Sequence, residues 1–201
     1  MIRAITALLI AAVSAAALAQ APTNPTVRVR GTVEKLDGQV LTVKARDGQS
    51  MSIKLADDFV VMGIQKASIS DIDSGKFIGT TTVGERDGAL VAIEVHIFPE
   101  NMRGTGEGHY DWDLRPGSKM TNANVANVVK MAGDRVMTVQ YKGGEKKILV
   151  TDNTVVVSYV PVDKSELKPG APVFIGTQKQ PDGSFNAARV NVGLHGQVPP
   201  M

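Results

Sequence analysis

The chain has 201 residues, a formal net charge of +2 and no cysteine. Proteins that bind nucleic acid usually carry a strong positive charge that neutralises the phosphates. A nearly neutral chain does not fit this pattern, so nucleic acid is not an expected partner. The lack of cysteine excludes disulfides, thiolate metal sites and a cysteine nucleophile, so stability must come from packed apolar cores. The length suits one or two domains.

Residues 1–19 predict a signal peptide. Arg3 gives a short positive start, residues 4–17 are almost entirely apolar, and Ala17-Leu18-Ala19 fits the small-x-small cleavage pattern. Cleavage near Ala19-Gln20 would remove Arg3 and release the chain into the periplasm or the medium. The apolar run is shorter than the about 20 residues that cross a bilayer, and no later run approaches that length. The mature chain is therefore expected to lack a transmembrane segment, and a retained N-terminal anchor is the alternative.

The remaining sequence is predicted to contain two copies of one module, because several blocks recur in the same order at offsets of 95 to 97 residues. Val40-Leu41-Thr42-Val43 recurs as Val136-Met137-Thr138-Val139, and Phe77-Ile78-Gly79-Thr80 recurs as Phe174-Ile175-Gly176-Thr177. The insertions fall between the blocks, where loops are expected. The duplication predicts a first module at 27–98, a linking segment at 99–120, a second module at 121–193 and a flexible tail at 194–201.

Within each module the hydrophobic period is two, which predicts half-buried strands. Val27, Val29 and Val33, for example, alternate with polar residues, and Asp37-Gly38 and Asp47-Gly48 are signals for hairpin turns. Ala132-Gly133 and Gly143-Gly144 are expected to form the same two turns in the second module. The clearest predicted strands are 27–33, 40–45, 51–55, 59–64, 76–83, 90–98, 155–160, 172–179 and 184–192.

One helical turn is predicted in each module, at Ser68–Asp71 and at Asp163–Glu166, because both stretches have the spacing of a capping box. Three strands, a short turn of helix and two more strands, joined by tight turns, predict an all-β fold. We expect two tandem small Greek-key barrels of the OB type, with a sandwich of short hairpins as the alternative. Aromatic residues make up only 4% of the chain, so the barrel interiors should be small and aliphatic.

Two motifs carry a resemblance to a known family. Gly31–Val43 reads G-T-V-x-x-L-D-G-x-x-L-T-V, and residues 167–190 contain L-K-P-G followed by D-G-x-x-x-A-x-x-V. These motifs resemble domain of unknown function 5666, a family of secreted bacterial OB-like modules. The first module departs from the pattern at Asp73-Ser74-Gly75, where the second has Lys-Pro-Gly. The resemblance implies no catalytic residues, and some similar chains carry a description that connects them with metal transport.

The linking segment contains the only tryptophan of the chain. In an extended strand Tyr110, Trp112 and Leu114 would point to one side, and the acidic residues and His109 would point to the other. We therefore expect the aromatic side to lie in the groove between the barrels, with the acidic side in solvent. The candidate binding residues are Tyr110, Trp112, Arg103 and Arg115.

Imidazole and carboxylate side chains in and near this segment also suggest a divalent metal. The candidate ligands are His96, Glu107, His109 and Asp111. Since an extended strand rises about 3.3 Å per residue, Glu107 and Asp113 would stand roughly 20 Å apart, so at most two neighbours in the segment could share one ion. The competing interpretation of His96 is an ordinary outward-facing polar residue on the last strand of the first module, and His195 is expected to be solvated in the tail.

Catalytic motifs are absent from the sequence: it has no Gly-x-Ser-x-Gly, no His-Glu-x-x-His and no recognisable spacing of base and nucleophile. We expect an exported, non-catalytic binding or accessory protein without a cofactor, whose partner is a protein or a component of the cell envelope. The alternative is a metal-binding accessory protein with a role in metal transport or homeostasis. An oligosaccharide or nucleic-acid binder is disfavoured because such barrels need exposed aromatic residues.

Overall fold

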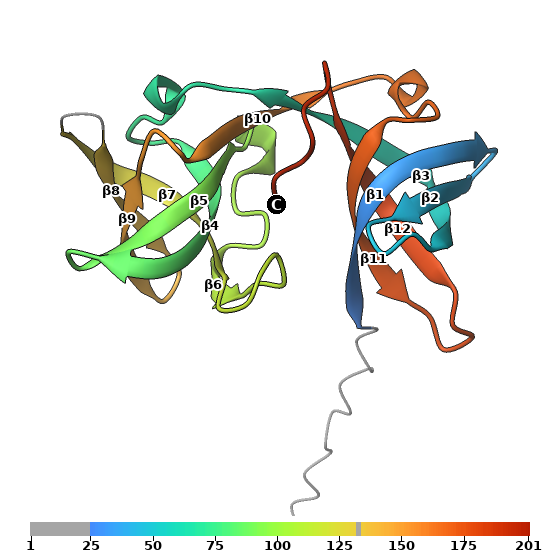
Figure 1. Ribbon diagram of the computed structural model, residues 1–201, viewed down its shortest axis with the longest axis horizontal. Helices are drawn as coiled ribbons and strands as arrows, with labels where there is room; N and C mark the ends of the chain where they lie inside the picture. The colour runs from blue at the N-terminus through green and yellow to red at the C-terminus, as the bar shows by residue number, and fades with distance from the viewer. Residues whose placement is uncertain (1–24, 132–133) are drawn as a thin grey trace, which may run out of the picture.

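The computed structural model describes residues 25–131 and 134–201 (Figure 1). The predicted signal peptide and the predicted turn at Ala132-Gly133 lie outside the described residues. No helix in the described part of the chain is long and apolar enough to cross a membrane. The strands are β1 (Thr26–Asp37), β2 (Val40–Ala45), β3 (Ser50–Lys66), β4 (Phe77–Arg86), β5 (Ala89–Ile97), β6 (Gly108–Asp111), β7 (Lys119–Lys130), β8 (Arg135–Tyr141), β9 (Gly144–Val150), β10 (Val155–Pro161), β11 (Pro172–Lys179) and β12 (Phe185–Gly193). The predicted all-β fold is confirmed.

Five strands close on themselves to form a barrel, which we call the first lobe. Its order is β12-β11-β1-β2-β3, and parallel pairing of β12 with β3 completes the circuit. The neighbours are antiparallel elsewhere; Val29 on β1, for example, lies opposite Ile175 on β11. The interior is almost entirely aliphatic, as the composition predicts, and it comprises Val29, Val33, Leu41, Val43, Ile53, Leu55, Phe59, Val61, Leu167, Ala171, Val173, Ile175, Ala187, Val190 and Val192.

A second group of strands, which we call the second lobe, has the order β5-β4-β7-β8-β9. Its ends meet where β5 pairs in parallel with β9, at Leu90 opposite Ile148 and Val91 opposite Leu149. Short β6 adds to the outer side of β7. The interior is again aliphatic and comprises Ile72, Ile78, Ala92, Val95, Ile97, Ala123, Val125, Met137, Val139, Ile148, Val150 and Val156.

The two lobes do not coincide with the predicted modules at 27–98 and 121–193. The first lobe takes β11 and β12 from the C-terminal half of the chain, and the second lobe takes β4 and β5 from the N-terminal half. β3 was predicted as two strands, 51–55 and 59–64, but it runs unbroken for 17 residues. Its C-terminal end pairs with β10, and the hairpin that follows it lies in the second lobe (Figure 1).

The lobes are joined by β3 and β10, which pair in antiparallel register with Ile64 opposite Tyr159. β10 also pairs in parallel with β5, at Val156 opposite Val95. Below this bridge a third cluster of buried side chains fills the space between the lobes, and it holds most of the aromatic rings of the chain. Its buried members are Met62, Ile64, Phe77, Phe98, Met102, Met120, Val157, Tyr159, Phe174 and Met201, with Tyr110 and Trp112 packed against them.

The two predicted helical turns are present as 3-10 turns, η1 (Ile69–Asp71) and η3 (Lys164–Glu166). Ser68 and Asp71 form the full capping box: the Ser68 hydroxyl accepts from Ser70 N, and the Asp71 carboxylate accepts from Ser68 N at 2.7 Å. In the second turn the Asp163 carboxylate accepts from Ser165 N at 2.8 Å. These local signals therefore predicted the turns correctly. A further 3-10 turn, η2 (Glu100–Met102), follows β5.

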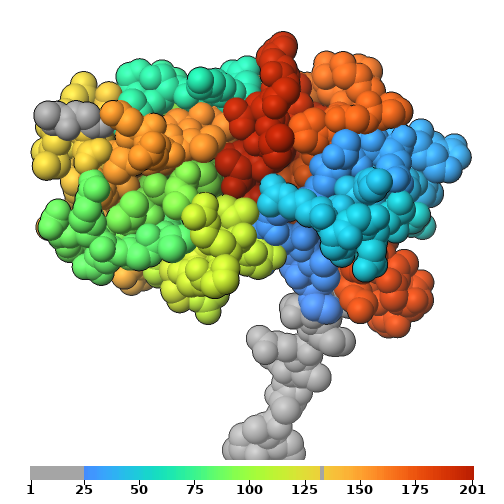
Figure 2. Space-filling model, viewed as in Figure 1, coloured from blue at the N-terminus to red at the C-terminus, as the bar shows by residue number. Residues whose placement is uncertain are grey.

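The C-terminal segment, predicted to be a flexible tail, is packed between the lobes (Figures 1 and 2). Leu194 N donates to Ile64 O at 2.9 Å, and Gln197 N donates to Leu194 O at 2.8 Å. The Met201 side chain is only 1% exposed, and Met201 O accepts from Arg30 Nε at 2.8 Å. The expectation of a free tail is therefore wrong, because its apolar end belongs to the third cluster, although His195 itself is exposed.

Candidate functional site

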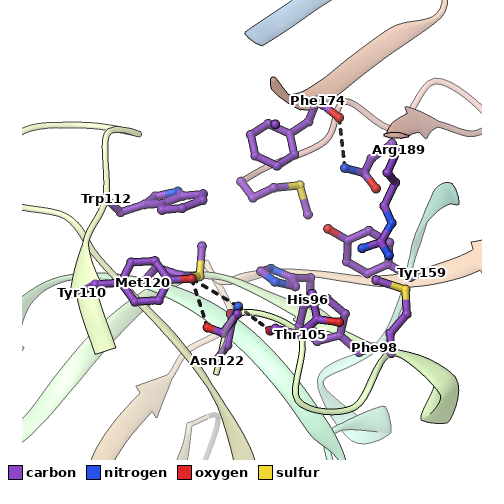
Figure 3. A pocket seen from close by; sticks show the side chains of 15 residues that line it. His96, Phe98, Thr105, Tyr110, Trp112, Met120, Asn122, Tyr159, Phe174 and Arg189 are labelled. Carbon is purple, nitrogen blue, oxygen red and sulfur yellow. Dashed lines mark hydrogen bonds between the residues drawn. The ribbon is translucent and has the colours of Figure 1, made fainter. Parts of the chain in front are cut away.

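A pocket of about 280 Å³ lies in the third cluster, between the two lobes (Figure 3). Strands from both halves of the chain contribute to it, together with the linking segment and the last residue. It is lined by His96, Phe98, Met102, Thr105, Gly106, Tyr110, Trp112, Met120, Asn122, Tyr159, Phe174, Gly176, Arg189, Asn191 and Met201. The volume is near the lower end of the range that small-molecule sites occupy.

Five aromatic side chains line this pocket: Phe98, Tyr110, Trp112, Tyr159 and Phe174. Phe98 stacks on Tyr159 with ring centres 5.1 Å apart and planes at 3°. The Trp112 ring lies 6.1 Å from Tyr110 and 6.3 Å from Phe174. Burial raises the pKa of both Tyr110 and Tyr159 above the ordinary range of a phenol, so both hydroxyls are protonated at neutral pH.

A buried carboxylate and imidazole lie side by side behind this wall. His96 is 3% exposed and Glu94 only 1% exposed, and the Glu94 Oε2 to His96 Nδ1 distance is 3.0 Å. The Thr81 hydroxyl donates to Glu94 Oε1 at 2.5 Å. Gly79 leaves the space for the imidazole, because a Cβ at this position would lie 1.9 Å from His96 Nε2. The pair gives the pocket an imidazole of fixed orientation.

The position of His96 corrects the interpretation of an outward-facing polar residue. That interpretation assumed that one face of the strand is open to water. The residues Glu94–Ile97 of β5 are instead all buried. Val95 and Ile97 belong to the interior of the second lobe, and the rings of Phe98 and Tyr159 lie against His96. Because both faces of the strand are covered, alternation no longer separates inside from outside.

The pocket also holds polar atoms that have no partner. Five buried side-chain nitrogen or oxygen atoms lack a hydrogen bond among the described residues, and four of them belong to residues that line the pocket: Trp112 Nε1, Asn122 Oδ1, Arg189 Nε and Asn191 Oδ1. The amide nitrogens of both asparagines are used, by Thr105 O at 3.1 Å and by Phe174 O at 3.0 Å. An unpaired buried polar group costs about 1–3 kcal/mol, so a cluster of them indicates a place where something else binds.

An ion-pair clamp between β1 and the linking segment lies beside Trp112 of the pocket. Arg30 Nη2 lies 2.7 Å from Asp113 Oδ1, and Arg28 Nη1 lies 3.7 Å from Asp113 Oδ2. The Arg28 guanidinium also lies over the Trp112 ring, 4.0 Å from its centre. β1 of the first lobe is thereby tied to the linking segment that carries Trp112.

No protein-family model, curated protein or solved structure matches this chain. The resemblance to domain of unknown function 5666 stays a prediction.

The structure brings two of the four predicted binding residues into the pocket. Tyr110 and Trp112 line it, on the side of the segment that alternation predicted. Arg103 instead pairs with Glu100 and donates to Gly75 O at 2.9 Å, and Arg115 lies exposed in the turn that follows Trp112. Neither arginine lines the pocket.

The predicted metal ligands each have a separate partner. Glu107 accepts from Lys142 N at 2.9 Å, His109 Nδ1 lies 2.8 Å from Thr121 Oγ1, and Asp111 pairs with Lys119. Burial, together with the charges of Lys146 and Lys119, lowers the pKa of His109. Within the described residues no group of three or more histidine or acidic side chains could hold an ion. Metal binding stays a prediction, without a preformed cluster to support it.

The clamp predicts an acid response. Partial burial works against ionisation of Asp113, but the Arg30 hydrogen bond and the charges of Arg30 and Arg28 outweigh it and lower the pKa of Asp113. Because the folded pKa is depressed, the stabilisation is present above the unfolded value of about 3.9 and is lost as the pH falls through the folded value. Trp112 fluorescence should therefore change at a pH below about 4. In Asp113→Asn this step should be absent, whereas Asp152→Asn, in an exposed turn, should keep it.

Proposed function

We propose that the protein is an exported, non-catalytic binding protein that holds a small molecule with a ring-sized apolar body in the pocket between its lobes. The observation that carries the proposal is the set of four unpartnered polar atoms in an otherwise largely apolar wall. A ligand that paired them would recover part of the cost of their burial. The concave shape favours a small molecule over the protein or envelope partner that the sequence also left open.

We infer further that each lobe is an OB-like unit and that the two units arose by duplication. In both lobes three consecutive antiparallel strands are closed by a hairpin: β1-β2-β3 by β11-β12, and β7-β8-β9 by β4-β5. In both, the third strand pairs in parallel with the second strand of the hairpin. This common order supports a Greek-key barrel and agrees with the repeat in the sequence.

Gly176 offers a direct test of the proposal. It lines the pocket, its backbone is ordinary, and a Cβ added there would meet no atom within 4 Å. Phe174 and Gly176 lie two residues apart on β11, so a side chain at 176 points to the pocket side of the strand. Gly176→Leu should therefore fill the pocket without straining the fold.

The binding experiment uses phenylacetate and 2-phenylethanol as probes, with calorimetry and Trp112 fluorescence as readouts. We expect at least one probe to bind the unaltered protein. Gly176→Leu should weaken its binding by tenfold or more, because the leucine would occupy the space in which the apolar body of the probe is buried. Lys179→Leu, exposed on the same strand, is the matched control and should bind normally. Binding that survives Gly176→Leu would place the ligand elsewhere.

The metal-binding alternative has its own measurement. Elemental analysis of protein purified from its native compartment, before and after dialysis against a chelator, would detect a resident ion. A stoichiometric metal that left with the chelator would overturn the small-molecule proposal in favour of a metal-binding accessory protein.

A further inference from the structure

Arg189 of β12 differs from the other arginines near the pocket because it has no partner. Arg28 and Arg30 pair with Asp113. The side chain of Arg189 takes part in no ion pair and no hydrogen bond among the described residues, although the residue is partly buried and its Nε is fully buried. Figure 3 shows its side chain extending beside Tyr159 at one end of the pocket.

No acidic side chain accompanies Arg189 among the described residues that line the pocket. Arg189 is the one lysine or arginine among these described residues. Glu94, behind the wall, is already engaged by His96 and Thr81. A guanidinium stays protonated in proteins, so Arg189 brings a permanent positive charge to a largely apolar cavity.

A guanidinium in this setting best recognises a carboxylate, because its planar fork can donate two parallel hydrogen bonds to the two oxygens. The unpartnered Trp112 Nε1 is a second free donor of the same pocket. The rings of Phe98, Tyr159 and Phe174 supply the apolar surface for the rest of the ligand. The unpartnered oxygens of Asn122 and Asn191 can accept from a hydroxyl or amino group on that ligand.

We infer that the ligand of this pocket is a small monocarboxylate with an apolar, ring-sized body, and that Arg189 determines its selectivity by binding the carboxylate. This inference rests on the proposed function, since it names the class of molecule that the pocket holds. It is independent of the Asp113 clamp, whose arginines are already paired.

The test compares phenylacetate with 2-phenylethanol, which has a ring of the same size but no charge. On the unaltered protein phenylacetate should bind about 10- to 100-fold more tightly, the worth of a charge-assisted hydrogen bond. Arg189→Met keeps an apolar stem of similar length and should remove this preference while leaving the affinity for 2-phenylethanol within about twofold. Arg189→Lys keeps the charge without the fork and should give an intermediate preference.

Arg46→Met, at an exposed site, is the matched control and should retain the full preference. Equal binding of the two probes to the unaltered protein, or tighter binding of the cation phenethylamine, would overturn the carboxylate inference and leave the pocket proposal standing. Failure of both ring probes to bind at all would overturn the pocket proposal and the inference together. A thermal melt of each variant checks that it is folded. If Arg189→Met is unfolded, the test uses Arg189→Lys alone. An undiminished preference of Arg189→Lys for phenylacetate would then contradict the role of the guanidinium.

Discussion

Cut between Gly104 and Thr105, the chain is expected to yield two pieces that fold only in each other's presence. The first piece, residues 25–104, carries β1 to β5, and the second, residues 105–201, carries β6 to β12. Each lobe contains strands from both pieces, so neither piece can complete a lobe with the pairings that the structure has. Two self-contained tandem modules would behave in the opposite way, with each piece folding alone.

The size of the shared cores supports this expectation. Within the described residues, seven of the fifteen buried members of the first interior come from the second piece: Leu167, Ala171, Val173, Ile175, Ala187, Val190 and Val192. At about 1.5–3 kcal/mol for each large aliphatic side chain, their burial contributes on the order of 10 kcal/mol. That is comparable with the entire 5–15 kcal/mol by which native proteins are stable, so a piece without its partner should not hold the fold.

Circular dichroism and light scattering of the separate and mixed pieces test the expectation. Each piece alone should lack a cooperative melt as a monomer, and mixing should restore both the strand signal and a 1:1 complex. The uncut protein is the reference. A monomeric first piece that melts cooperatively would show that β4 and β5 can pair with β1, β2 and β3. Folding would then not require the hairpins to be exchanged between the two halves of the chain.

Local features of the fold were predictable because they depend on neighbours in sequence. Period-two alternation found most of the strands, and the capping residue Ser68 marked the turn that follows β3. The exchange of hairpins between lobes was not predictable in this way. The repeated modules have the same pattern, so β1 could pair equally well with β4 or with β11 on pattern alone. The choice depends on contacts between residues far apart in the sequence, such as the pairing of β3 with β10, which alternation does not encode.

The candidate site was predictable in the linking segment and not elsewhere. Tyr110 and Trp112 stood out because they alternate with polar residues in a segment with no other role. Glu94 and His96 lie on a strand whose consecutive residues are buried on both faces, which alternation cannot reveal. Arg189 occupies a position in β12 that looks solvated from the sequence, and only the neighbouring lobe turns it into part of a pocket.

Replacing Glu94 with valine is expected to cost about 3–5 kcal/mol of folding free energy, because the change removes one partner of a buried pair. His96 Nδ1 would lose its hydrogen-bond partner, and the Thr81 hydroxyl would lose its acceptor. Neither group can turn to water, since both residues are buried. Glu94→Gln, which keeps a hydrogen-bonding oxygen at the same place, should cost less.

The double variant Glu94→Val with His96→Phe separates pairing from packing. When both partners of a buried pair are replaced by apolar groups, the part of the penalty that comes from the unpaired imidazole disappears, and only the Thr81 hydroxyl is left without its acceptor. The introduced phenyl ring would also retain the edge-on contacts that the imidazole of His96 makes with Phe98 and Tyr159, at 4.9 and 5.6 Å. Urea denaturation of the two single variants and the double variant gives the coupling energy, which should offset at least half of the sum of the single costs. Costs that simply add would mean that Glu94 and His96 stabilise the fold independently, and the fixed imidazole orientation assigned to the pocket would lose its basis.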